Sequence, residues 1–284
     1  MSAPLDPRIH AYRDDLAAVS LRGRVEARRF VVGTVRQVSA GIAALREAPA
    51  AEAEQTSQLL FGEVFTVYDE QSGWAWGQAA ADRYVGYLEA AHLAGPLAPT
   101  HLVRDPLAFL RPQPRVQAAP LATLSMGARL AIAVIEGDHA RVACGSFVAA
   151  RHLSAADAVE PDHAATAERL LDAPYLWGGR SALGIDCSGL VQIALQRAGH
   201  PAPRDSDMQE SLGAPVPDGE LGALHRGDLV FWRGHCAIVL DAERLIHANA
   251  GDMRVAITPL GETLARYERT LDLPVRAFRR MPRP

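Results

Sequence analysis

The sequence of 284 residues predicts an α+β protein, in which two small β units precede a domain where helices come before an antiparallel sheet. Short alternating apolar runs fill the first hundred residues, and a similar pattern recurs after a proline-rich connection. Helical periodicity begins only in the last part of the chain. We therefore expect an N-terminal extension over residues 1–20, β units over 21–95 and 96–156, and an α+β domain over 157–284.

The first β unit is predicted from apolar runs that Gly or clusters of polar residues separate, a pattern typical of antiparallel strands. The runs are Arg29–Val32, Glu63–Tyr68, Trp74–Trp76 and Tyr84–Leu88. Many prolines between residues 94 and 120 indicate a connection to the next unit.

The second β unit is predicted from an internal repeat. Leu60–Val67 aligns with Ser125–Ile132, and Tyr87–Leu93 aligns with Phe147–Leu153. Two blocks that match at both ends indicate a duplicated small β-barrel.

The C-terminal domain is predicted from two helical segments followed by three strand-like runs. One helix is expected over Asp162–Leu171, before Pro174, and another over Ser188–Ala198, where Gly199 is the stop signal. Strands are expected over Asp228–Trp232, His235–Leu240 and Arg244–Ala248.

Composition argues against several classes of partner. The net charge is −4 and no block of five basic residues occurs, so neither nucleic acid nor an anionic membrane is an expected partner. No apolar run approaches the roughly eighteen residues of a membrane-spanning helix. The N-terminus lacks a basic region followed by an apolar run, so we expect no secretory signal. The expected location is cytoplasmic, or periplasmic if a signal has been removed.

A candidate nucleophile stands at the start of the second predicted helix, in Asp186-Cys187-Ser188-Gly189. The positive end of a helix dipole stabilises a thiolate and lowers its pKa. His235 and His247 each lie six residues from Asp241, so a turn at that point places them on one face of a hairpin. One imidazole can then act as base to Cys187 while the other orients it.

Other interpretations of these residues remain open. A lone cysteine before a helix is often a small buried hydrophobe, and two histidines on a hairpin are often surface or packing residues. Cys187, His235 and His247 are also a possible three-ligand zinc set, although no closely spaced ligand pair is present. Three cysteines without CxxC spacing argue against a disulfide framework and a structural zinc site. We expect Cys236 and Cys144 to be core packing residues, with Cys236 pointing away from the site.

The longer motifs resemble those of the NlpC-type cell-wall peptidases, which are papain-like enzymes. They are Tyr175-Leu176-Trp177-Gly178-Gly179, Gly184–Val191, Gly227–Trp232 and Gly234–Val239. The resemblance covers about residues 160 to 280. It implies that Cys187 is the nucleophile, His235 the base and His247 the orienting residue. It also implies that Tyr175 supports the oxyanion and that Asp186, Ser188 and Asp205 line the substrate cleft.

The β units resemble the bacterial SH3-like domains that precede this domain in one subgroup. That subgroup accepts short peptides with a free N-terminal L-alanine. By the same resemblance, Glu63 pairs with the ammonium group and Tyr87 blocks longer, sugar-linked substrates. The alternatives are that Glu63 is a solvated strand residue and that Tyr87 belongs to the core.

The resemblance predicts a γ-D-glutamyl–L-diamino-acid endopeptidase, needing no cofactor or metal, that acts on murein peptides during recycling. It would release L-Ala-γ-D-Glu from meso-diaminopimelate or L-Lys. A non-catalytic protein that binds wall peptides and an acyl transferase on the same scaffold are the alternatives. The sequence leaves the oligomeric state open.

Overall fold

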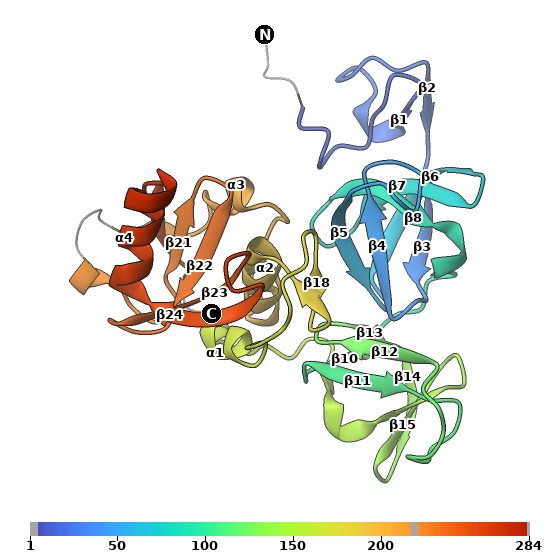
Figure 1. The fold of residues 1–284 in the computed structure, drawn as a ribbon. Coiled ribbons are helices and arrows are strands. Elements are labelled where there is room, and N and C mark those ends of the chain that lie inside the picture. The colour runs from blue at the N-terminus through green and yellow to red at the C-terminus, as the bar shows by residue number, and fades with distance from the viewer. Residues whose placement is uncertain (1–4, 217–220, 283–284) are drawn as a thin grey trace. The chain divides into compact units, whose positions relative to one another are not determined.

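The computed structural model describes residues 5–216 and 221–282 (Figure 1). Contacts divide the chain into two compact units, Met1–Ala156 and Asp157–Pro284. In the predicted extension, Met1 to Pro4 lie outside the described residues. The following residues pack on the first β unit, where Leu16 and Leu21 share a buried cluster with Trp76.

The first β unit is built on one antiparallel sheet of seven strands, in the order β5-β4-β8-β7-β6-β3-β9. A short parallel pair, β1 (Leu16–Ala18) with β2 (Arg29–Val31), precedes it. The seven strands are β3 (Thr34–Val38), β4 (Ile42–Arg46), β5 (Gln55–Leu60), β6 (Val64–Gln71), β7 (Trp74–Ala79), β8 (Val85–Glu89) and β9 (Leu93–Ala94). Alternate residues such as Leu45, Phe65 and Leu88 form its core. The predicted runs therefore correspond to β2, β6, β7 and β8.

The second β unit repeats part of this element order in smaller sheets. Its strands are β10 (His101–Val103), β11 (Leu107–Leu110), β12 (Ala122–Ser125), β13 (Arg129–Leu130), β14 (Ile132–Glu136), β15 (His139–Val142), β16 (Phe147–Ala149) and β17 (Leu153–Ala155). The 3-10 helices Ala90–His92 and Ala150–His152 occupy equivalent places in the repeat, each just before a strand. Because the strands form three separate sheets, the second SH3-like barrel stays a prediction.

Cys144 contradicts its predicted place in the core. The side chain is exposed, and its Sγ lies 3.7 Å from Ser146 Oγ. The reason is local, because the next residue, Gly145, has a φ of +91° and turns the chain between β15 and β16. A turn at the surface directs this side chain to solvent.

The C-terminal unit has a six-stranded antiparallel sheet in the order β20-β25-β21-β22-β23-β24. Its strands are β20 (Ala214–Pro215), β21 (Leu229–Trp232), β22 (His235–Val239), β23 (Arg244–Asn249), β24 (Arg254–Pro259) and β25 (Ala277–Arg280). A separate two-stranded pair joins β18 (Arg180–Ser181) and β19 (Gly184–Ile185), and a 3-10 helix spans Leu221–Ala223. The helices are α1 (His163–Glu168), α2 (Cys187–Arg197), α3 (Ser206–Gln209) and α4 (Leu260–Leu271).

Helices cover both faces of this sheet (Figure 1). Helix α2 packs against β22 and β23. On the other face, Tyr267 and Leu260 of α4 join a buried cluster with Trp232, Val239 and Leu245. The α+β prediction therefore holds for this unit, while β24, α4 and β25 were not predicted. No helix in the described part of the chain is long and apolar enough to cross a membrane.

Candidate active site

Cys187 is the first residue of α2 and is 7 % exposed. The helix begins here because Asp186 has extended backbone angles and its Oδ1 accepts a hydrogen bond of 2.7 Å from Gly189 N–H. This cap leaves the thiol at the positive end of an eleven-residue helix. The helix predicted from the sequence began one residue later, at Ser188.

Asp186 is held by a buried ion pair. Its carboxylate accepts two hydrogen bonds from Arg204, of 2.5 and 3.0 Å, and one of 2.8 Å from Gly178 N–H. Arg204 is 1 % exposed and also donates to Ser188 Oγ at 2.8 Å. These contacts fix the loop before the nucleophile. The predicted roles of Asp186 and Ser188 in substrate binding stay predictions.

The two histidines lie on one face of the β22–β23 hairpin, as predicted. Ile238 pairs with Ile246, so this register makes His235 and His247 diagonal neighbours rather than directly opposite residues. His235 Nε2 lies 2.9 Å from His247 Nδ1. Burial, and secondly the neighbouring His235, lowers the pKa of His247 to about 3, so this ring is neutral near pH 7.

Asn249 and Asp252 extend the network beyond His247. Asn249 Nδ2 lies 3.0 Å from His247 Nε2 and donates to Asp252 Oδ2 at 2.9 Å. The backbone N–H of Asp252 donates to Asn249 Oδ1 at 2.8 Å. A longer contact of 3.4 Å joins Thr258 Oγ1 to His247 Nε2. These residues were not predicted from the sequence, although Asn249 stands two positions after His247 on the same strand.

Aromatic rings fix the plane of His235. Tyr267 of α4 stacks on it with ring centroids 5.0 Å apart and an angle of 15°, and Trp232 lies 5.5 Å away. Burial, and secondly the charge of Cys187, raises the pKa of Tyr267 to about 12. Nothing in the sequence indicated that α4 supplies a wall of the site.

The electrostatics favour a thiolate at Cys187. A hydrogen bond with Cys236 lowers the Cys187 pKa most, burial acts in the opposite direction, and a hydrogen bond with His235 lowers the pKa further. Burial and then the contact with Cys187 raise the pKa of Cys236. Cys187 Sγ lies 4.0 Å from the carbonyl oxygen of Gly234, the residue just before His235, so the nucleophile and the base predicted from the sequence are neighbours.

Cys236 packs in the core, as predicted, but it does not lie apart from the site. Strand alternation does turn its side chain to the face of the sheet opposite His235, but α2 covers that face and begins with Cys187. The Cys236 thiol is fully buried and lowers the pKa of the nucleophile. It is a packing residue that also belongs to the site.

Tyr175 and Asp205 complete the predicted residues of this unit. Tyr175 is half-buried, and burial, followed by the charge of Cys187, raises the pKa of its phenol to about 12. Asp205 is half-buried just before α3, where its carbonyl accepts from the backbone N–H groups of Met208 and Gln209. Their roles toward a substrate stay predictions.

Glu63 and Tyr87 belong to the N-terminal unit. Glu63 is buried, and its Oε2 accepts a hydrogen bond of 2.9 Å from Leu60 N–H, which closes the turn between β5 and β6. It is therefore not a solvated strand residue. Tyr87 is half-buried on β8, and Arg13 Nη1 donates to its hydroxyl at 3.0 Å. Their roles in gripping a substrate stay predictions.

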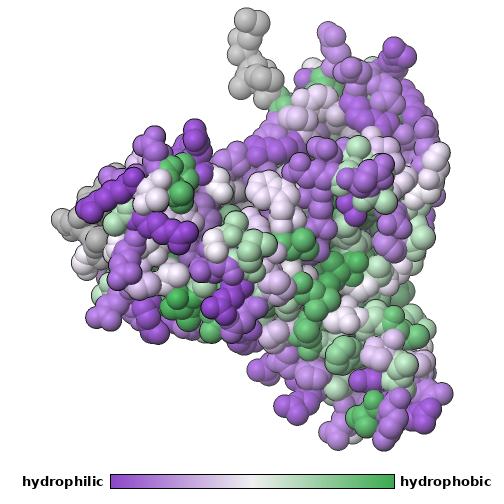
Figure 2. All heavy atoms as spheres, viewed as in Figure 1, coloured by the Kyte–Doolittle hydropathy of each residue, from purple (hydrophilic) through white to green (hydrophobic). Residues whose placement is uncertain are grey.

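Apolar side chains reach the surface next to the nucleophile. Hydrophilic residues predominate on the face of the C-terminal unit that Figure 2 shows. In contrast, Leu176, Trp177 and Leu183 are exposed in the segment that joins Tyr175 to the α2 cap. This segment offers apolar contacts near Cys187.

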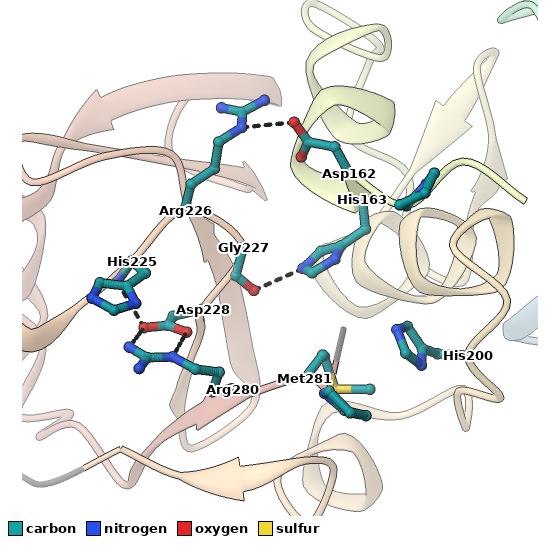
Figure 3. A pocket seen from close by; sticks show the side chains of 11 residues that line it. Asp162, His163, His200, His225, Arg226, Gly227, Asp228, Arg280 and Met281 are labelled. Atoms are coloured by element: carbon teal, nitrogen blue, oxygen red, sulfur yellow. Dashed lines mark hydrogen bonds and ion pairs between the residues drawn. The ribbon is translucent and has the colours of Figure 1, made fainter. Parts of the chain in front are cut away.

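A separate cavity of about 510 Å³ lies between α1 and the start of β21 (Figure 3). Several of its polar side chains already have partners. His163 Nε2 lies 2.7 Å from Gly227 O, Arg226 pairs with Asp162, and Arg280 pairs with Asp228. None of the residues that line it is a predicted catalytic residue.

Within residues 5–216 and 221–282, no group of three or more His, Cys, Asp or Glu is arranged to hold a metal ion.

Comparisons with known proteins define the class of the C-terminal unit. Residues 172–271 match the NlpC/P60 family. A crystal structure of an NlpC/P60 family protein from Bacillus cereus superposes with a TM-score of 0.75 at 22 % identity, covering 88 % of this chain and all of that chain. The C-terminal unit thus has the NlpC/P60 fold.

The remaining matches define the subgroup. Residues 45–93 match the bacterial dipeptidyl-peptidase SH3 domain. Dipeptidyl-peptidase 6 of Lysinibacillus sphaericus is 27 % identical over 85 % of this chain and 97 % of its own. The γ-D-glutamyl-L-lysine dipeptidyl-peptidase of Bacillus subtilis is 27 % identical over 78 % of this chain and 81 % of its own. The chain therefore carries an NlpC/P60 domain preceded by a bacterial SH3 domain, which confirms the resemblance found in the sequence.

Proposed function

We propose that the protein is a cysteine endopeptidase that cleaves the bond between γ-D-Glu and a diamino acid in murein peptides. The hydrogen-bonded series Cys187, His235 and His247 carries this proposal, because it joins a stabilised thiolate to an oriented base. The name of the Bacillus subtilis relative, a γ-D-glutamyl-L-lysine dipeptidyl-peptidase, supports the choice of bond.

The reaction would proceed through a thioester. The Cys187 thiolate attacks the γ-carbonyl carbon, the C–N bond breaks, and His235 gives a proton to the departing amine. With Nε2 engaged by His247, the Nδ1 atom of His235 is left for this transfer. Water then attacks the thioester as His235 takes up its proton, which releases L-Ala-D-Glu and restores the thiolate.

The neighbouring groups would support this chemistry without changing charge. Because its pKa is about 12, the phenol of Tyr175 keeps its proton near pH 7 and can donate to the oxyanion. Asp186 and Ser188 fix the nucleophile, and Asp205 would bind the peptide.

Glu63 and Tyr87 would restrict substrates to short peptides with a free N-terminal L-alanine. The setting we propose is recycling of murein fragments in the cytoplasm, which fractionation of the native protein tests.

The direct test incubates the protein with L-Ala-γ-D-Glu-meso-diaminopimelate or its L-Lys analogue and follows the products by mass spectrometry. Release of L-Ala-D-Glu by the wild type and by Cys144→Ser, but not by Cys187→Ala, is the expected result. An N-acetylated peptide should be cut much more slowly if Glu63 binds the ammonium group. Transfer of the dipeptide to an added amine, or binding without release, would instead favour the acyl transferase or the binding protein.

A further inference from the structure

Two buried thiols meet at the start of α2. Cys236 lies on β22, the strand against which α2 packs, and Cys187 Sγ lies 4.0 Å from Gly234 O, two residues before Cys236. The neighbouring Cys236 thiol lowers the pKa of Cys187. Cys236 Sγ also lies 3.7 Å from Gln209 Oε1. Gln209 is itself fixed, because its Nε2 donates to Ser188 O at 2.9 Å and to Pro203 O at 2.8 Å. The second thiol is therefore held against the first turn of the helix that carries the nucleophile.

We propose that a peroxide converts Cys187 and Cys236 into a reversible disulfide, which switches the peptidase off and protects the nucleophile from irreversible oxidation. The switching part rests on the proposed function, since it assumes that Cys187 is the nucleophile. The bond itself depends only on the two thiols.

The chemistry balances in two steps. The Cys187 thiolate attacks one oxygen of the hydroperoxide, which breaks the O–O bond, forms a sulfenic acid and releases hydroxide. The Cys236 sulfur then attacks the Cys187 sulfur, loses its proton and expels the hydroxyl group as water. A dithiol reductant returns both thiols and is itself oxidised to a disulfide.

The two thiols suit different steps of this sequence. The lowered pKa of Cys187 provides the thiolate that reacts with peroxide, while the raised pKa of Cys236 keeps that thiol protonated at rest. Cys236 therefore reacts only after Cys187 has been oxidised. The third cysteine, Cys144, lies in the other compact unit and serves as the matched control.

The test exposes the full chain carrying Cys144→Ser to graded hydrogen peroxide and reads intact mass, disulfide-linked peptides and peptidase activity. We expect a mass loss of two hydrogens, a peptide pair joining Cys187 to Cys236, and activity that returns with dithiothreitol. In Cys236→Ala and Cys236→Ser, peroxide should instead add oxygen to Cys187. The form with two added oxygens should keep its increased mass after treatment with the reductant. The wild type should behave as Cys144→Ser does.

Two outcomes would overturn the inference. One is oxygen accumulating on Cys187 in the presence of Cys236 without a linked peptide. The other is equal recovery from peroxide with and without Cys236. Because the mass readout needs no substrate, a protein that forms the disulfide but does not cut murein peptides would refute the proposed function alone.

Discussion

Two buried polar clusters flank Cys187, and they are built from different kinds of group. Before the cysteine, Asp186 and Arg204 form a buried ion pair with short hydrogen bonds. On the hairpin, His235 and His247 form a pair joined by one bond between ring nitrogens, and His247 is neutral. The first cluster is an ion pair between a carboxylate and a guanidinium, whereas the second is a pair of imidazole rings joined nitrogen to nitrogen.

The difference shows how the site separates position from chemistry. The charge of Asp186 alone disfavours a thiolate, since it raises the Cys187 pKa. Arg204 places an opposite charge within 2.5 Å of that carboxylate and so offsets the effect. The ion pair can therefore anchor the helix start without opposing the thiolate, which leaves proton transfer to the histidines.

The largest expected effect comes from breaking the ion pair with Arg204→Met. The substitution leaves the Asp186 carboxylate buried without its partner, so we expect the free energy of unfolding to fall by about 3–5 kcal/mol. Urea denaturation measures this change. The matched control is Arg226→Met, which breaks exposed pairs with Asp162 and Glu168 and should change stability by less than about 1 kcal/mol. Equal effects of the two substitutions would contradict the anchoring role.

A smaller effect is expected when the neutral histidine is replaced, and it depends on pH. The unfolded chain binds a proton at His247 near its ordinary pKa of 6.5, whereas the folded chain does so only near 3. Stability therefore falls as pH decreases through this window. Between pH 6.5 and about pH 5 the wild type should lose about 2 kcal/mol more than His247→Gln, which carries no titrating ring. Parallel stability curves in urea for the two proteins would show that His247 is not held neutral.

Local patterns predicted the elements that carry the reaction, but not the contacts that support them. The residues before Cys187 indicated a helix start, and the spacing about Asp241 placed His235 and His247 on one face. Arg204 reaches Asp186 from eighteen positions along the chain, so no periodicity points to it. For Cys236, alternation gave the correct face, but the strand does not encode which helix covers that face.

The smallest expected effect is at Asn249, which links the histidine pair to Asp252. Asn249→Ala removes one hydrogen bond to His247. Because Asn249 is buried and contacts His247, we expect the change to disturb only the orientation of the base and to lower kcat by about tenfold with KM unchanged. Thr258→Val is the control, since its contact with the same nitrogen is 3.4 Å long and should matter less. Steady-state kinetics on the tripeptide separates the two cases. A rise in KM alone would place Asn249 in substrate binding. An equal loss of kcat in both variants would mean that packing against the sheet, rather than this amide, orients His247.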